Sequence, residues 1–138
     1  MTASDGAPTR LDHGALLVAD EQRARDFYVG ALGLTEVPRP ANFDFPGLWV
    51  AVGDQQLHII GEAEAGRARE LQPGYRPDEL ARGYGTHLAL EVADFGAYLA
   101  RLRDRGIEIE GGPRDRGDGV QQAYVTDPDG HVIEIMGP

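Results

Sequence analysis

The chain has 138 residues, a length that suits a single domain with its own hydrophobic core. Its 23 acidic residues outnumber its 13 basic ones, and the formal charge of −10 argues against nucleic acid or an anionic membrane as a partner. Cysteine is absent, which excludes disulfides and thiolate ligands, so any metal ion would have to be held by His, Asp or Glu.

The sequence also predicts neither a membrane span nor a secretion signal. No apolar run approaches the roughly 20 residues that a membrane-spanning helix needs. The first ten residues are largely polar and lack the apolar core of a signal peptide. We therefore expect a cytoplasmic protein.

The first predicted strand begins at His13 and reads His-Gly-Ala-Leu-Leu-Val-Ala-Asp, ending at Asp20. A helix is predicted next, because apolar residues follow at the spacing of one helical face. Asp20 can cap its first turn and Gly33 can end it. The apolar residues on this face are Ala24, Phe27, Tyr28, Ala31 and Leu32.

Three further strands complete the first half of the chain. They are predicted at residues 35–37, 47–52 and 56–60, with Val52-Gly-Asp-Gln55 as the turn between the last two. Residues 62–83 are rich in Gly, Glu, Arg and Pro, a composition typical of a connector. The first half therefore reads as one strand, a helix and three strands.

The second half repeats the first. From His87 to Asp94 it reads His-Leu-Ala-Leu-Glu-Val-Ala-Asp, identical at six of eight positions to the stretch that begins at His13. A helix capped by Asp94 and ended by Gly106 follows, and then strands at residues 107–110, 121–126 and 132–136. The sequence Asp-Pro-Asp-Gly at residues 127–130 predicts a turn between the last two strands.

These elements predict an α+β fold built from two tandem βαβββ modules, residues 10–61 and 84–137, joined by the connector at residues 62–83. We expect one domain over residues 1–138. If a pseudo-twofold axis relates the modules, their sheets form a half-open, cup-like mixed β-sheet barrel.

Polar residues interrupt the apolar strands at places that the repeat relates. His13 and His87 open the first strand of each half, while His58 and Glu134 lie in the last. Alternation along a strand places them on the sheet face opposite the helix, where the cup would bring them together. Three imidazoles and a carboxylate suit one divalent ion, such as Zn, Ni, Fe, Co or Mn. Each residue could instead be a hydrogen-bonded or ion-paired group of the core, and His131, on the other face from Glu134, is expected to be structural.

This pattern resembles the vicinal oxygen chelate superfamily, which includes glyoxalase I, methylmalonyl-CoA epimerase, extradiol dioxygenases, fosfomycin-resistance transferases and bleomycin-resistance proteins. The resemblance extends from Leu11 to Gly137. Its most specific parts are Leu-Asp-His13 leading to Val-Ala-Asp20, Phe27-Tyr28, Leu32-Gly-Leu34, the stretch at residues 87–94, and Asp-Pro-Asp-Gly-His-Val-Ile-Glu at residues 127–134.

The resemblance implies a metal site at the four positions His13, His58, His87 and Glu134. In this superfamily the metal binds two adjacent substrate oxygens and acts as a Lewis acid. Members that rearrange protons usually carry Glu or Gln where this chain has His58, which argues against glyoxalase I or epimerase activity. Glu134 is the expected proton carrier, and Glu91, which could equally be a solvated carboxylate, is a second candidate.

Two functions follow from these expectations. The first is a metal-dependent lyase, isomerase or dioxygenase that acts on a small oxygenated substrate, and the second is an antibiotic- or drug-binding protein without catalysis. A homodimer is expected because it is common in the superfamily.

Trp49, Tyr124 and Arg114 are the predicted substrate-binding residues, although each could instead belong to the core or surface. Weaker candidates are Phe43, Phe45, Tyr75, Tyr84 and Arg116.

Overall fold

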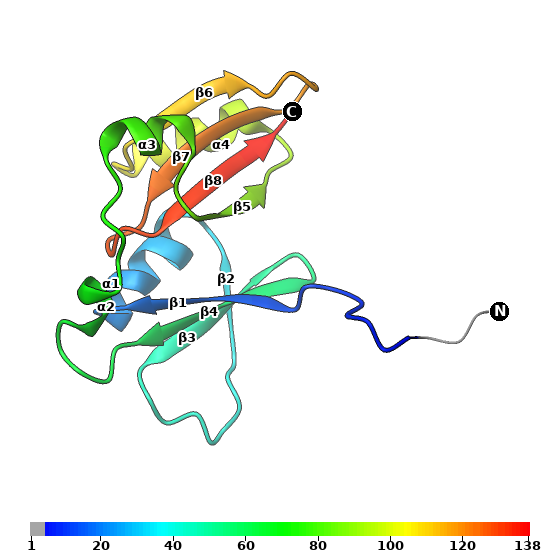
Figure 1. Cartoon of the computed structure of the whole chain (residues 1–138). Helices are drawn as coiled ribbons and strands as arrows, with labels where there is room; N and C mark the ends of the chain where they lie inside the picture. The colour runs from blue at the N-terminus through cyan, green and yellow to red at the C-terminus, as the bar shows by residue number, and fades with distance from the viewer. Residues whose placement is uncertain (1–4) are drawn as a thin grey trace.

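The computed structural model describes residues 5–138, and it contains two four-stranded mixed sheets, one in each module (Figure 1). The α+β class and the repeated order of one strand, a helix and three strands are confirmed, and the two sheets stay separate rather than closing into one barrel. The first module consists of β1 (His13–Val18), α1 (Glu21–Arg25), the π-helical η1 (Asp26–Ala31), β2 (Thr35–Val37), β3 (Gly47–Val52) and β4 (Gln55–Gly61).

The second module has the same order of elements, apart from the π-helical turn. The connector between the modules contains two short helices, α2 (Arg67–Glu70) and α3 (Pro77–Arg82). None of the helices within residues 5–138 is long and apolar enough to cross a membrane. The second module consists of β5 (His87–Glu91), α4 (Phe95–Asp104), β6 (Gly111–Asp115), β7 (Gln121–Thr126) and β8 (Val132–Gly137).

The strand order places the first and last strand of each module side by side. The orders are β1-β4-β3-β2 and β5-β8-β7-β6, and β1 with β4, like β5 with β8, runs parallel. Ala15 is the register partner of His58, and Ala89 that of Glu134. Candidate ligands that are far apart in the sequence therefore come from neighbouring strands.

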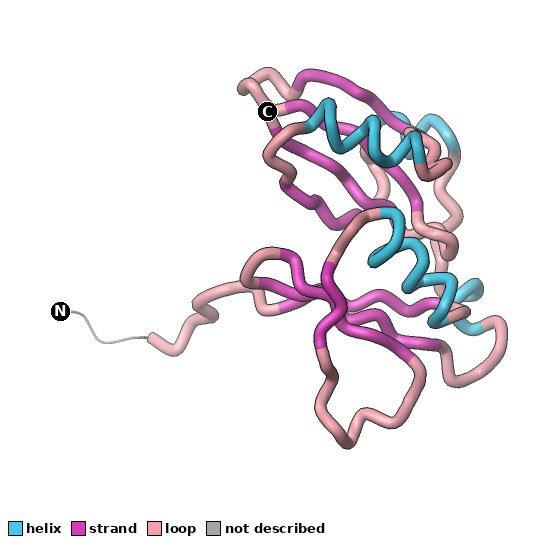
Figure 2. Tube along the Cα trace, turned by 180° about the vertical axis from the view of Figure 1, so that it is seen from behind, coloured by secondary structure: helices cyan, strands magenta, loops and turns pink. Residues whose placement is uncertain are grey.

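Both modules place their helices on the same side of the sheets, where α4 lies next to the α1–η1 helix (Figure 2). The Tyr98 hydroxyl donates to the Leu32 carbonyl at 2.6 Å, which joins the two helical layers. One hydrophobic core contains residues of both modules, including Val18, Leu102 and Ile133. The opposite faces of the sheets carry no helix of their own module, but the connector helix α3 lies against that face of the second sheet, next to β6 (Figure 1). The polar residues of the site therefore lie on the sheet faces opposite α1 and α4.

The predicted helix starts are confirmed by the geometry of their caps. The Asp20 carboxylate accepts from the Arg23 N–H at 2.8 Å, and the Asp94 carboxylate accepts from the Ala97 N–H at 3.0 Å. These bonds satisfy backbone donors that have no partner within a first helical turn. The repeated Val-Ala-Asp thus ends a strand and begins a helix in each module.

Replacing Asp94 by Ala is expected to lower the free energy of unfolding by about 1 kcal/mol, because the first turn of α4 loses its cap. Urea denaturation measures the change. Asp94→Asn keeps a side-chain acceptor and is the matched control, expected to cost much less. Equal losses in the two variants would contradict the capping explanation.

The strand predicted at residues 107–110 is wrong. The Ile107 N–H donates to the Leu102 carbonyl at 2.9 Å and so closes the end of α4, and β6 begins only at Gly111. Ile107 and Ile109 do pack against the core. The alternation of apolar residues therefore indicated correctly that they pack against the core, but it could not distinguish a half-buried loop from a strand.

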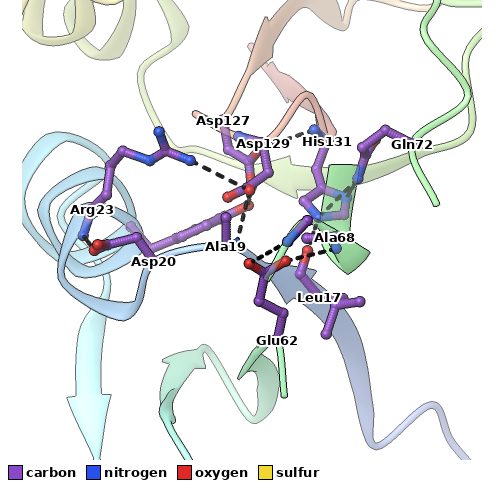
Figure 3. A network of polar contacts seen from close by, with 12 residues as sticks. Leu17, Ala19, Asp20, Arg23, Glu62, Ala68, Gln72, Asp127, Asp129 and His131 are labelled. Carbon is purple, nitrogen blue, oxygen red and sulfur yellow. Dashed lines mark hydrogen bonds and ion pairs between the residues drawn. The ribbon is translucent and has the colours of Figure 1, made fainter. Parts of the chain in front are cut away.

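The β7–β8 turn joins the two modules through a network of polar contacts (Figure 3). The Tyr28 hydroxyl donates to Asp127 Oδ2 at 2.7 Å, and Asp129 Oδ1 accepts from the Ala19 N–H at 2.9 Å. His131 Nε2 lies 2.7 Å from the Leu17 carbonyl oxygen, to which it donates. His131 therefore links β8 to β1, in agreement with the structural role expected for it.

Candidate functional site

Two of the predicted ligands, His13 and His58, form a half-site on the helix-free face of the first sheet, and we call it the module 1 half-site. The two rings stack with centroids 3.9 Å apart at 16°. Trp49 of β3 stacks on His58 with centroids 3.8 Å apart at 1°. The three rings form a row across β1, β4 and β3, because His58 has β1 on one side and its register partner Trp49 on the other.

Each ring of the module 1 half-site has one nitrogen engaged by a neighbouring acceptor. His13 Nδ1 lies 2.9 Å from the carboxylate of Asp12, and His58 Nε2 lies 2.9 Å from the side-chain oxygen of Gln56. Since carboxylate and carbonyl oxygens only accept, these nitrogens carry the hydrogen. Burial, helped by the neighbouring His13, lowers the pKa of His58 and favours its neutral ring. In the neutral rings, a lone pair remains on His13 Nε2 and on His58 Nδ1.

The module 2 half-site consists of His87 on β5 and Glu134 on β8. His87 Nδ1 donates to the Gly85 carbonyl at 2.7 Å, which leaves Nε2 as the acceptor of the neutral ring. This Nε2 lies 4.0 Å from Glu134 Oε1. Two bonds of about 2.0–2.2 Å to one metal ion can span such a gap.

Glu134 is 5% exposed, and neighbouring side chains hold its carboxylate. The Tyr124 hydroxyl donates to Glu134 Oε1 at 2.7 Å, and Gln122 Nε2 donates to the same oxygen at 2.9 Å. Arg114 donates to the Tyr124 oxygen at 3.2 Å and to the Arg82 carbonyl at 2.9 Å. Burial, together with the bond to Glu134, raises the pKa of Tyr124, so its hydroxyl stays protonated and can donate.

The donor set of the two half-sites fits a divalent transition metal. Metal-binding histidines typically donate their second nitrogen to a carboxylate or carbonyl, which fixes the ring and the tautomer. His13, His58 and His87 each make such a bond, to Asp12, Gln56 and Gly85. Neutral imidazole and carboxylate are ligands that Zn, Ni, Fe, Co and Mn accept.

The four predicted ligands do not converge within one chain. Between residues 5 and 138, no group of three or more His, Asp or Glu side chains lies close enough to hold a metal ion. The structure brings them together as two pairs, one on each sheet. The meeting of all four at one point of a single chain, which the cup would require, is therefore not observed.

The predicted substrate-binding residues lie beside the ligand candidates. Trp49 stacks on His58, and Tyr124 binds Glu134 while Arg114 binds Tyr124. Phe43 continues the aromatic row, with its ring centroid 5.5 Å from that of Trp49. The other candidates are more distant: Phe45 packs against Phe43, Arg116 pairs with Asp118, Tyr84 is largely exposed, and Glu91 is exposed at the end of β5.

Sequence reasoning missed the residues that orient the ligands. Gln56 precedes His58 by two positions and Gln122 precedes Tyr124 by two, so each pair shares one face of its strand. That spacing was a usable signal. The sequence carried no signal for the contact of His87 with the Gly85 carbonyl, because any backbone carbonyl could have accepted this hydrogen bond.

A cavity of about 280 Å³ lies where the two modules and the connector meet, and His87 forms part of its wall. The edge strands β1 and β5 approach each other here, since a Cβ on Gly14 would lie 3.3 Å from the Leu88 side chain. Tyr75 and Gln72 of the connector also line the cavity. Space for a small molecule is therefore available beside the module 2 half-site.

Tandem βαβββ modules, each with a pair of candidate ligand side chains on the sheet face opposite its own helix, define a class of small α+β proteins. The family model described as the Glyoxalase/Bleomycin resistance protein/Dioxygenase superfamily matches residues 10–135. The chain belongs to this superfamily, which confirms the resemblance seen in the sequence.

Individual relatives include both enzymes and binding proteins. Lactoylglutathione lyase of Shigella flexneri is 33% identical over 131 residues, covering 92% of this chain and 91% of its own. A solved structure of a glyoxalase family protein from Bacillus anthracis is 26% identical with a TM-score of 0.76, covering 97% of this chain and 98% of its own. An antibiotic-binding protein from a Streptomyces species is 28% identical with a TM-score of 0.69, covering 96% and 98%.

Proposed function

We propose that the chain is a divalent-metal-dependent enzyme of the lyase, isomerase or dioxygenase type that acts on a small oxygenated substrate, with His13, His58, His87 and Glu134 as metal ligands. The observation that carries the proposal is the orientation of the three histidines. Each gives one nitrogen to a neighbouring acceptor, and the other nitrogen has no hydrogen-bond partner within residues 5–138, an arrangement typical of metal ligands. The lyase type is favoured by the similarity to lactoylglutathione lyases.

A bound metal ion would polarise two adjacent substrate oxygens and stabilise negative charge on them. Glu134 is the residue suited to move a proton, because its carboxylate is buried and held at one oxygen by Tyr124 and Gln122. The cavity beside His87 is large enough for a small substrate. Its walls, which include Leu16, Leu88 and Tyr75, favour a substrate with an apolar part.

We further propose that the enzyme is a homodimer in which the module 1 half-site of one copy faces the module 2 half-site of the other. Each half-site has only two ligands, whereas zinc-type sites use at least three protein ligands. Both half-sites lie on the sheet faces opposite α1 and α4, where the side chains of His13 and His87 remain partly exposed to a second copy. Twofold symmetry would build two complete sites from the four half-sites.

The test is metal binding together with activity. After reconstitution, the protein is expected to bind about one transition-metal ion per chain, measured by elemental mass spectrometry, and to show a metal-dependent enzyme activity. Lactoylglutathione lyase activity is assayed first because of the similarity to those enzymes, although His58 argues against it, and other lyase, isomerase and dioxygenase reactions follow. Removal of the metal by a chelator should abolish this activity, and return of the metal should restore it. Failure to bind any of Zn, Ni, Fe, Co or Mn would contradict the proposal.

Antibiotic or drug binding without catalysis is the second candidate. It is favoured by the cluster of aromatic rings formed by Trp49, Phe43 and Phe45, because planar ligands stack on such rings. The similarity to an antibiotic-binding protein favours it as well. In that case the affinity for the ligand would be unchanged by a chelator.

A further inference from the structure

Each module places an aromatic residue directly across from the ligand of its last strand. Trp49 is the register partner of His58, and Tyr124 is the register partner of Glu134. The two aromatic residues occupy equivalent strands, β3 and β7, and their side chains lie on the same sheet face as the candidate ligands, opposite the helix of their own module. The repeat thus preserves a ligand and its cross-strand aromatic neighbour as a unit.

We propose that Tyr124 is a positioning residue that fixes the Glu134 carboxylate for metal binding and proton transfer, rather than a residue that contacts the substrate. This inference rests on the proposed metal-dependent function. The hydroxyl of Tyr124 contacts Glu134 Oε1 at 2.7 Å, and its ring meets that of His87 edge to face with centroids 5.5 Å apart. Tyr124 therefore contacts both ligands of the module 2 half-site.

The direction of the Tyr124 hydrogen bond is determined by Arg114. A guanidinium group only donates, so the Tyr124 oxygen accepts from Arg114 at 3.2 Å and directs its own proton to Glu134. Arg114 is itself anchored by the Arg82 carbonyl at the end of α3. A chain of hydrogen bonds thus runs from the connector to the carboxylate.

The carboxylate of Glu134 is held at only one of its oxygens. Oε1 accepts from both Tyr124 and Gln122, and no hydrogen bond from within residues 5–138 is recorded at Oε2. Two donors on one oxygen restrict rotation of the carboxylate, because turning it would break both bonds. Such outer contacts orient metal ligands and raise their affinity for the ion.

The connector holds the Tyr124 ring in place. Gly83, which ends α3 with a φ of 73°, lies so close to the phenol end of Tyr124 that a Cβ there would overlap it. The ring is also 5.4 Å from the Arg114 guanidinium carbon. Tyr124 is 2% exposed, which leaves little of it for a substrate to touch.

Tyr124→Phe is the informative variant, because it removes the hydroxyl and keeps the ring. We expect it to weaken Zn²⁺ binding about 10- to 100-fold, the usual effect of losing an outer hydrogen bond to a ligand. Competition with a chelating indicator measures the affinity, and the visible absorption of Co²⁺-loaded protein should change as the coordination geometry changes. Tyr98→Phe is the matched control, since it also removes a hydroxyl that donates to an oxygen, the Leu32 carbonyl, and should leave metal binding unchanged.

A double variant separates positioning from a general loss of stability. If Tyr124 acts through Glu134, Tyr124→Phe should cost no further affinity once Glu134→Ala is present. Wild-type affinity and Co²⁺ spectrum in Tyr124→Phe, with binding lost in Glu134→Ala, would overturn the positioning role and leave the proposed function intact. Wild-type affinity in Glu134→Ala would overturn the proposed ligand set and the positioning role together.

Discussion

Replacing either His13 or His87 by Ala is expected to weaken metal binding at least about 100-fold, more than the loss of an outer hydrogen-bond partner would. The two residues lie in different half-sites, so equal losses would show that one ion depends on both. Calorimetric titration with Zn²⁺ measures the affinity. His131→Ala is the matched control, because His131 contacts the Leu17 carbonyl and Gln72 and has no part in either half-site.

A mixture of the His13→Ala and His87→Ala proteins tests how the half-sites combine. If each site joins two copies, a mixed dimer carries one doubly defective site and one intact site. Random exchange of subunits would then restore about a quarter of the wild-type number of high-affinity sites, since about half of the dimers are mixed. If all four ligands came from one chain, co-refolding the two variants would restore none, and the proposed arrangement across two copies would be wrong.

The repeat in the sequence predicted most of the fold. The aspartates that end the two related stretches, Asp20 and Asp94, begin the helices as expected. The strands at residues 35–37, 47–52 and 121–126 have the predicted bounds. The error at residues 107–110 arose because a period of two reports which side chains are buried, whereas a strand also needs a partner for its backbone groups.

The residues of the candidate site could be predicted from the sequence, but their arrangement in space could not. Alternation along the strands placed His58 and Glu134 on the sheet faces opposite α1 and α4, and the structure agrees, although the connector helix α3 also lies against that face of the second sheet. How two sheets sit relative to each other depends on packing between them, which no local pattern encodes, so the separation into half-sites was not foreseen. The cross-strand pairing of Tyr124 with Glu134 likewise becomes apparent only from the register.

The second large effect is expected at the contact between the modules. The Tyr28 hydroxyl donates to Asp127 Oδ2 at 2.7 Å, and both side chains are buried, at 0% and 5% exposure. Tyr28→Phe would leave that carboxylate oxygen buried without its donor. We expect a loss of about 1–3 kcal/mol in the free energy of unfolding, the usual cost of an unsatisfied buried polar group.

The loss of stability in Tyr28→Phe should depend on pH, and the direction of this dependence follows from the pKa of Asp127. Burial raises this pKa above its ordinary value of 3.8, while the Tyr28 hydrogen bond opposes the rise by stabilising the charged form. The folded state therefore holds the proton more tightly than the unfolded state, and this group's contribution to stability falls as pH rises from 3.8 through the raised pKa. Without Tyr28 the pKa rises further, so the cost of Tyr28→Phe should be small at low pH and grow toward neutral pH.

Urea denaturation of wild type and Tyr28→Phe across this pH range measures the difference. Tyr98→Phe is the control for a lost tyrosine hydroxyl, and its cost should not vary with pH, because the Leu32 carbonyl that it leaves unpaired does not titrate. In an Asp127→Asn background, the effect of Tyr28→Phe should likewise become independent of pH, since the amide carries no proton equilibrium here. A cost of Tyr28→Phe that stays constant from acid to neutral pH would show that Asp127 does not ionise against this hydroxyl.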